Sequence, residues 1–374
     1  MIEPFSLKDQ LFNEGKIDYL SGLLVRADSS FDGAGFRALV MSRLLDLELM
    51  QRIDWIADCL TEVLPADFND AAHLIEACLP PPLNPDKTDD DFGDFIFAPF
   101  GEYVARHGLD QHFDRSLDLL EALTQRFSME FAIRSFLNHR PGDVLERMRA
   151  WAEHPNYHVR RLVSEGTRPK LPWGKKIVLD PQAPLPLLDL LYGDKTRFVT
   201  RSVANHLNDI SKTDAALVCD TLERWRGSTR QVPGEMGWIT SHALRTLVKR
   251  GDRRALELLG YHADAPVRLA SLSLADSSLK IGETLEIEAE LESDEDTPVL
   301  VDFLIWYHRP NGREASKVFK LKQARVQKGK TLRLAKRYRL KGKATTFTLH
   351  PGPHRLSLQV NGRILGEVEF QLCE

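Results

Sequence analysis

The period of the hydrophobic pattern changes near residue 273, and this change constrains the fold more than any other feature. From about residue 15 to 270 apolar residues recur every three or four positions, as in 36–50, which predicts helices. After residue 273 apolar and polar residues alternate, as in 283–291 and 299–306, which predicts strands. We therefore expect an all-α domain over 1–272 followed by an all-β domain over 273–374.

An internal repeat of about 40 residues marks the helical part. The segment 158–165 aligns with 198–205, and 266–272 is a weaker copy. A period near 40, with a turn before a Val-x-Arg motif, is typical of stacked helix pairs of the HEAT type. We predict a HEAT-like repeat solenoid, which displays one row of helices along a concave surface.

The β part contains about six or seven short alternating segments separated by turn signals, such as the hairpin pair Asn361-Gly362. Strands of this number and length are typical of a small immunoglobulin-like sandwich. The Cys–Trp–Cys spacing of antibody domains is absent, so the prediction concerns the architecture only.

Charge also divides the chain. Residues 1–127 carry 10 Lys and Arg against 24 Asp and Glu, and the remainder carries 40 against 30. Within 305–355 there are 15 basic residues and one acid, Glu314. Such asymmetry indicates a face that binds a polyanion, so we predict that the β domain is a DNA clamp. A solvated face that promotes solubility is the alternative.

Several function classes are disfavoured. No run of 18 apolar residues exists, and the N-terminus lacks a basic segment followed by an apolar one, so we expect a cytoplasmic protein that does not bind membranes. The four cysteines are widely spaced, and we expect no metal and no cofactor. The usual nucleotide-binding, hydrolase and metalloprotease motifs are absent, so any chemistry rests on carboxylates.

Polar residues form three stripes between 128 and 215. Residues four apart share one helix face. The stripes are Glu130–Arg134–Asn138, Arg161–Glu165 and Arg201–Asn205–Asp209. For any one stripe, a salt-bridged solvated face is the alternative. Because the stripes recur along the repeat, we predict that they line one groove.

A basic loop limited by prolines follows the second stripe and ends in Trp173. A tryptophan here can stack on a sugar or base, and the alternative is an aromatic that fills a gap between repeats. We assign His206 to DNA binding, with an ordinary hydrogen-bonded histidine as its alternative. DNA contacts are also assigned to the basic side chains Arg134, Arg160, Arg161, Arg168, Lys170 and Arg201.

The segments 130–138, 154–173 and 201–210 resemble the AlkC branch of the AlkC/AlkD alkylpurine DNA glycosylases. The resemblance covers roughly 15–270, and the β domain resembles the immunoglobulin-like extension of part of that branch. It implies a solenoid that holds duplex DNA and excises cationic bases such as 3-methyladenine and, in the AlkC branch, 3-methylcytosine. We expect a monomer whose partner is double-stranded DNA containing alkylated bases.

The resemblance also implies roles for individual residues. Glu165 and Asp209 are the charge-stabilising and water-positioning pair, Glu130 supports them, and Trp173 packs on the sugar of the lesion nucleotide. The AlkD branch has a tryptophan four residues before its catalytic aspartate, whereas this chain has Asn205. Specificity for 7-methylguanine is therefore not expected, and the sequence does not decide whether the base is flipped.

The chemistry of the bond favours the same residue types. A base methylated at a ring nitrogen is cationic and leaves neutral, so its departure needs little acid catalysis. The deoxyribose then becomes oxocarbenium-like, as in glycosidases, and requires a carboxylate and a positioned water. We predict a monofunctional DNA glycosylase. The alternatives are a non-catalytic HEAT-repeat scaffold and a damaged-DNA-binding protein that releases no base.

Overall fold

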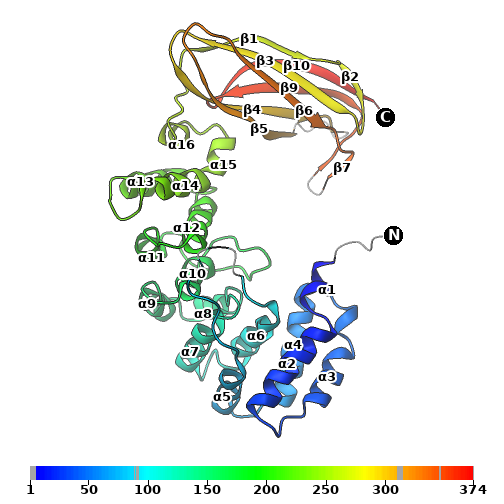
Figure 1. Cartoon of the computed structure of the whole chain (residues 1–374), viewed down its shortest axis with the longest axis vertical. Coiled ribbons are helices and arrows are strands. Elements are labelled where there is room, and N and C mark those ends of the chain that lie inside the picture. Colours follow the sequence, from blue (N-terminus) through cyan, green and yellow to red (C-terminus); the bar gives the residue numbers. More distant parts are fainter. Residues whose placement is uncertain (1–5, 88, 90–91, 310–314, 345–346, 374) are drawn as a thin grey trace. The chain divides into compact units, whose positions relative to one another are not determined.

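The computed structural model of this chain describes residues 6–87, 89, 92–309, 315–344 and 347–373. A helix-rich part is followed by a strand-rich part, as predicted (Figure 1). The structure separates into two compact units. Unit 1 comprises Met1–Thr213 and Trp225–Ala243, and unit 2 comprises Asp214–Arg224 and Leu244–Glu374. The domain boundary predicted after residue 272 stays a prediction.

The helices are short, and several begin at a polar residue whose side chain caps the first turn. In the described residues they are α1 Leu7–Leu11, α2 Glu14–Ala27, α3 Gly33–Met41, η1 Leu44–Asp46, α4 Leu49–Val63, α5 Phe68–Cys78, η2 Phe95–Phe97, α6 Ala98–His107, α7 Phe113–Thr124, α8 Ile133–His139, α9 Pro141–Trp151, α10 Tyr157–Gly166, α11 Leu185–Leu191, α12 Arg197–Ile210, α13 Ala215–Arg226, α14 Pro233–Ala243, α15 Arg245–Lys249 and α16 Arg253–Leu258. At α10, for example, the Asn156 side chain accepts a hydrogen bond from the His158 backbone N–H.

The two copies of the repeat are the neighbouring helices α10 and α12, and α12 packs in turn against α14. The matched valines of the two copies, Val159 and Val199, are fully buried, as is Val203. Burying one such side chain contributes about 1.5–3 kcal/mol. The repeat therefore fixes a pair of adjacent helices, and it aligns the polar positions that the two helices share.

The weaker third copy, 266–272, does not form a helix. It lies in strand β1, and the expectation of a further repeat helix is wrong. A register shift between Leu269 and Ser271 lets both Leu269 and Leu272 pack against the sandwich core. This bulge gives apolar residues a spacing of three, which imitates a helical period.

Unit 2 contains a sandwich of two main sheets. The strands are β1 Val267–Leu274, β2 Ser278–Lys280, β3 Thr284–Ser293, β4 Thr297–Tyr307, β5 Ala315–Val326, β6 Leu332–Arg339, β7 Lys343–Ala344, β8 Phe347–Thr348, β9 Gly352–Val360 and β10 Arg363–Cys373. One sheet has the order β1-β3-β6 and the other β2-β10-β9-β4-β5. Large apolar residues such as Phe303, Ile287 and Leu356 fill the core between them.

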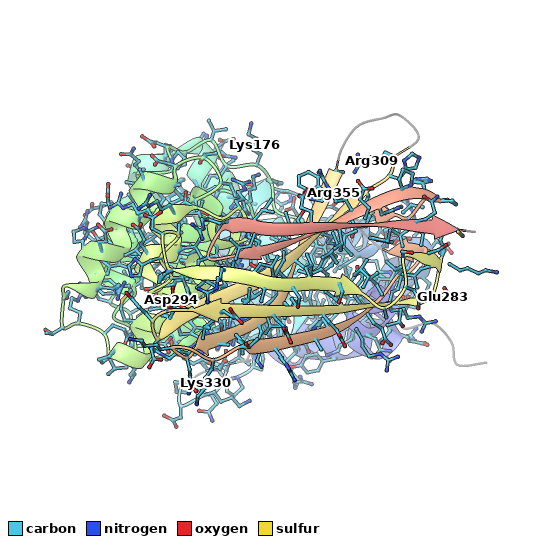
Figure 2. The ribbon with its side chains drawn as sticks, turned by 90° about the horizontal axis from the view of Figure 1, so that it is seen from above. Lys176, Glu283, Asp294, Arg309, Lys330 and Arg355 are labelled. Atoms are coloured by element: carbon cyan, nitrogen blue, oxygen red, sulfur yellow. The ribbon has the colours of Figure 1, made fainter. Side chains whose placement is uncertain are left out.

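Turns join the strands at the two ends of the sandwich. Asp294 and Lys330 lie near one end, and Glu283 lies near the other (Figure 2). The predicted hairpin at Asn361-Gly362 is confirmed, since both residues have positive φ, +46° and +83°, and connect β9 to β10.

Candidate active site

The helices α10 and α12 bring the two predicted catalytic carboxylates together. Glu165 lies in the last turn of α10, and Asp209 lies in the last turn of α12. One guanidinium joins them: Arg168 donates from Nη1 to Glu165 Oε1 at 2.5 Å and from Nε to Asp209 Oδ2 at 3.0 Å. The carboxylates of neighbouring repeat helices therefore share one cation.

A second guanidinium extends the site to the third carboxylate. Arg161 donates from Nη1 to Glu130 Oε2 at 2.9 Å, and its Nη2 lies 3.6 Å from Glu165 Oε2. At the other end Lys212 Nζ donates to Asp209 Oδ1 at 2.8 Å. We call this series of linked side chains the carboxylate cluster; its members are Glu130, Arg161, Glu165, Arg168, Asp209 and Lys212. Its three carboxylates and three cations alternate.

Burial gives the cluster its electrostatic character. Glu165 and Asp209 are each 4% exposed. Burial raises the pKa of Glu165, but Arg161, Arg168 and a hydrogen bond from Ser202 outweigh it and hold that pKa below its ordinary value. Glu165 is thus ionised at neutral pH although it is shielded from water.

Ser202 is a site residue that the sequence analysis missed. Its hydroxyl is buried and donates to Glu165 Oε2 at 2.6 Å. Ser202 occupies the repeat position of Leu162, and a small polar residue at a position that is apolar in the other copy was the available signal. Ser202 therefore binds Oε2 of Glu165, while Arg168 binds Oε1 of the same carboxylate.

Trp173 is 61% exposed and follows Arg168 by five residues along the same loop. Its backbone lies in the left-handed region, with φ +60°. An indole with this exposure can meet a flat or apolar ligand surface beside the carboxylate cluster.

Two predicted DNA-binding residues are buried instead. Arg134 is 1% exposed and donates to backbone carbonyls. His206 is fully buried, and its Nδ1 lies 3.1 Å from the Ser164 carbonyl oxygen. Burial lowers the pKa of His206 to about 4, so the ring is neutral. The geometry gives neither side chain a route to a phosphate.

The other predicted DNA-binding residues differ in their availability. Arg160 pairs with Asp194, and Arg201 pairs with the Asp89 carboxylate. Arg161 and Arg168 belong to the carboxylate cluster. Lys170 is exposed on the loop that carries Trp173. The basic surface beside the cluster is therefore smaller than the sequence indicates.

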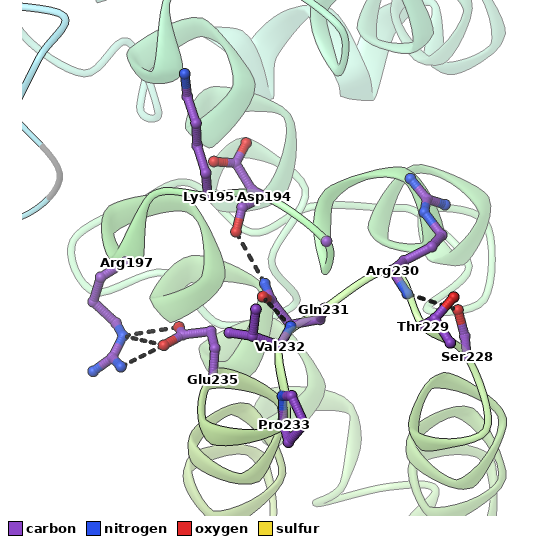
Figure 3. A pocket seen from close by; sticks show the side chains of 11 residues that line it. Asp194, Lys195, Arg197, Ser228, Thr229, Arg230, Gln231, Val232, Pro233 and Glu235 are labelled. Carbon is purple, nitrogen blue, oxygen red and sulfur yellow. Dashed lines mark hydrogen bonds and ion pairs between the residues drawn. The ribbon is translucent and has the colours of Figure 1, made fainter.

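A pocket opens near the N-terminal ends of α12 and α14, where Arg197 and Glu235 form an ion pair (Figure 3). Gln231 crosses it and donates to the carbonyls of Tyr192 and Asp194. Arg197 is twelve residues before Asp209, about 18 Å along the helix. This pocket is thus separate from the carboxylate cluster.

The basic segment of the sandwich is partly neutralised. On β6, Arg333 and Arg337 pair with Glu290 and Glu286 of β3 at 3.0 Å. The cations exposed on β5 include Lys322 and Arg325, which pair with no carboxylate in the described part of the chain. Glu314, the acid counted in this segment, lies outside the described residues. Any polyanion-binding face therefore involves β5 more than β6.

Neither a membrane span nor a metal site is found in the described part of the chain. No helix there is both long enough and apolar enough to cross a membrane. In the same residues no three His, Cys, Asp or Glu side chains are grouped as ligands for a metal ion.

Comparisons with known proteins agree with this fold. Residues 109–247 match the family described as DNA alkylation repair enzyme, and residues 268–374 match the C-terminal Ig-like domain of the uncharacterised protein YhaZ. The uncharacterised protein YhaZ of Bacillus subtilis (strain 168) is 34% identical over 371 residues, which cover 97% of this chain and 99% of that protein.

A solved structure is similar over nearly the whole length. The alkylpurine DNA glycosylase AlkC of Pseudomonas fluorescens, bound to DNA containing an abasic site analog, is 33% identical, with a TM-score of 0.87 over 99% of this chain and 100% of that one. The fold and the cluster thus define a helical DNA alkylation repair protein that carries an Ig-like domain. The chain belongs to the AlkC branch of the DNA alkylation repair enzyme family, as the sequence motifs predicted.

Proposed function

We propose that this protein is a monofunctional DNA glycosylase that hydrolyses the N-glycosidic bond of cationic alkylated bases, such as 3-methyladenine and 3-methylcytosine, in duplex DNA. The single observation that carries the proposal is the joining of Glu165 and Asp209 by Arg168. Two carboxylates held together by one guanidinium fit a reaction in which positive charge develops on a sugar.

In this mechanism the carboxylates of Glu165 and Asp209 stabilise the oxocarbenium-like sugar and orient the attacking water. The methylated base leaves neutral and needs no proton from the protein. Glu130 acts through Arg161, which it holds against Glu165. The exposed indole of Trp173 packs on the sugar of the lesion nucleotide.

The wider organisation is part of the proposal. The succession of α10, α12 and α14 supports a HEAT-like solenoid with the cluster on its concave face. The solenoid over 1–272 would hold the duplex as a monomer in the cytoplasm, and the sandwich over 273–374 would act as a DNA clamp. The solved complex of AlkC with DNA that contains an abasic site analog supports DNA as the partner.

A second candidate function is a damaged-DNA-binding protein without activity. It is favoured by the pairing within the carboxylate cluster, where every carboxylate already contacts a cation. A neutral, self-satisfied cluster can support structure alone.

The proposal is tested with DNA methylated to contain 3-methyladenine and chromatography of the released bases. We expect Glu165→Gln and Asp209→Asn each to lower release by about 100-fold or more while DNA affinity changes little, because each removes charge stabilisation of the transition state. Glu235→Gln is the matched control, since it neutralises an ion-paired carboxylate outside the cluster.

If the Glu165→Gln variant and the Asp209→Asn variant each released methylated bases as fast as the wild-type protein, the catalytic assignment would be contradicted. Binding of methylated DNA with no release by the wild-type protein would establish the second candidate instead.

A further inference from the structure

The loop that carries Trp173 holds an unfavourable conformation at its exposed tip. Trp173 has φ +60°, a region that bulky side chains rarely adopt, and its indole is 61% exposed. A bulky residue in this conformation is strained and persists only where its surroundings fix it. The contacts of the loop with α8 hold Trp173 in this conformation.

One buried arginine of α8 binds the loop backbone at both sides of the tip. Arg134 Nη1 donates to the carbonyl oxygens of Gly166 at 3.0 Å and Arg168 at 2.9 Å, and Nε donates to that of Lys175 at 2.5 Å. The planar guanidinium thus binds three carbonyl groups whose residues lie up to nine positions apart in the sequence. Hydrogen bonds from a charged donor in a buried site are stronger than neutral ones.

One turn further along α8, an asparagine binds the same loop beyond the tip. Asn138 Nδ2 donates to the Lys176 carbonyl oxygen at 2.9 Å, and its Oδ1 accepts from the Val178 N–H at 2.8 Å. This pair of bonds imitates a strand ladder and fixes the direction of the chain. Leu171 and Ile177, both buried, anchor the loop on either side of Trp173.

The same contacts link the loop to the carboxylate cluster. The Arg168 carbonyl accepts from Arg134, while the Arg168 side chain joins Glu165 to Asp209. A change in the position of the loop backbone would therefore move the cation that holds the two carboxylates together.

We propose that Arg134 and Asn138 are positioning residues that clamp the loop 168–178 and hold the Trp173 indole in place for the sugar of the lesion nucleotide. The stripe Arg134–Asn138, predicted from the sequence as groove-lining, acts on the loop backbone. This inference rests on the proposed function and deepens it, because it assigns the preorganisation of the sugar-binding element to α8.

The test uses the full-length Asn138→Ala variant, which removes both bonds from an exposed side chain. We expect the folded protein to be cleaved by trypsin at Lys175 or Lys176 about tenfold faster than wild type, with a similar thermal midpoint. We expect kcat on methylated DNA to fall by roughly tenfold and KM to change less. The control is Asn69→Ala, an exposed helical asparagine of α5 outside the loop, which should match wild type.

A double-mutant cycle separates positioning from a merely structural role. If Asn138 acts through Trp173, Asn138→Ala should have no further effect on kcat in a Trp173→Ala background. Arg134→Lys keeps the positive charge but loses the planar guanidinium that binds several carbonyls at once. We expect its kcat to lie between those of the wild type and of Trp173→Ala.

Unchanged cleavage of Asn138→Ala by trypsin would overturn the clamp, and additive losses of kcat in the double variant would overturn its action through Trp173. If the wild-type protein releases no base, the proposed function fails separately. In that case the affinity for methylated duplex DNA is measured for the same single and double variants. Losses of affinity that do not add would support the clamp, and losses that add would overturn it.

Discussion

Buried charges at the end of α10 and α12 show how single residues set the character of this site. Glu165 is nearly inaccessible to water, yet it stays ionised because Arg161, Arg168 and Ser202 each contact its carboxylate. The i,i+4 spacing predicted that Glu165 and Arg161 share a face, and they do. The bridging role of Arg168 depends on the path of the loop after α10, which no helical period encodes.

A histidine behind the cluster gives the protein a defined dependence on pH. The pKa of His206 is lowered to about 4 by burial, whereas an unfolded histidine titrates near 6.5. The unfolded state therefore binds a proton between these values and the folded state does not, so stability is lost as pH falls from 6.5 toward 4. We expect the free energy of unfolding to fall by roughly 2 kcal/mol from this residue between pH 7 and 5.

The measurement is urea unfolding at both pH values for wild type and His206→Asn, whose amide can still donate to the Ser164 carbonyl. The variant should lack this part of the pH dependence. Equal losses of stability in the two proteins would show that His206 does not contribute.

At the scale of elements, a β-bulge explains why one apolar spacing in the sequence indicated a helix where the structure has a strand. The bulge in β1 made a strand look like a third repeat helix, whereas the alternation in β3 and β4 predicted strands correctly. A second bulge lies in β5, where Leu321 is the extra residue opposite Val301 and Asp302 of β4. Asp302 is a buried carboxylate: it is 5% exposed and lies opposite Lys320 of β5. β4 lies between β9 and β5, and nearly all of its residues are buried, so a group that strand alternation alone would leave in solvent is buried here.

Asp302 is expected to destabilise its sandwich at neutral pH. Burial raises the pKa of Asp302 to about 6, and Lys320 and Lys249 offset this only in part. The folded state therefore binds the proton more tightly than the unfolded state, and stability falls as pH rises from about 4 to 6. Asp302→Asn should raise the free energy of unfolding by about 1–3 kcal/mol at pH 7.5 and change it little at pH 4. Chemical unfolding of both proteins at the two pH values checks this, and a variant less stable than wild type at pH 7.5 would contradict it.

At the scale of the whole molecule, the uneven charge of the chain is only partly available to a partner. The acidic residues of β3 neutralise Arg333 and Arg337 on β6, and Asp89 from the acidic N-terminal third pairs with Arg201 of α12. Counting basic residues along the sequence therefore overestimates the surface that attracts a polyanion.

This distinction can be measured as the salt dependence of DNA affinity. If the sandwich contacts phosphates through β5, Lys322→Ala with Arg325→Ala should lower the slope of log affinity against log salt by about 2. The matched pair Arg333→Ala with Arg337→Ala removes the same charge from β6 and should lower it less. Equal effects of the two pairs, or none, would contradict a clamp through β5.

The sequence by itself determined the helical and β parts, the repeat that pairs α10 with α12, and the residue types of the carboxylate cluster, because periodicity and composition are local properties of the chain. The tertiary structure alone decided which cations hold which carboxylates, that Ser202 completes the site, and that Arg134 and His206 are buried. These depend on the paths of loops and on contacts between residues 34 to 112 positions apart, where burial and charge pairing are settled only once the chain has folded.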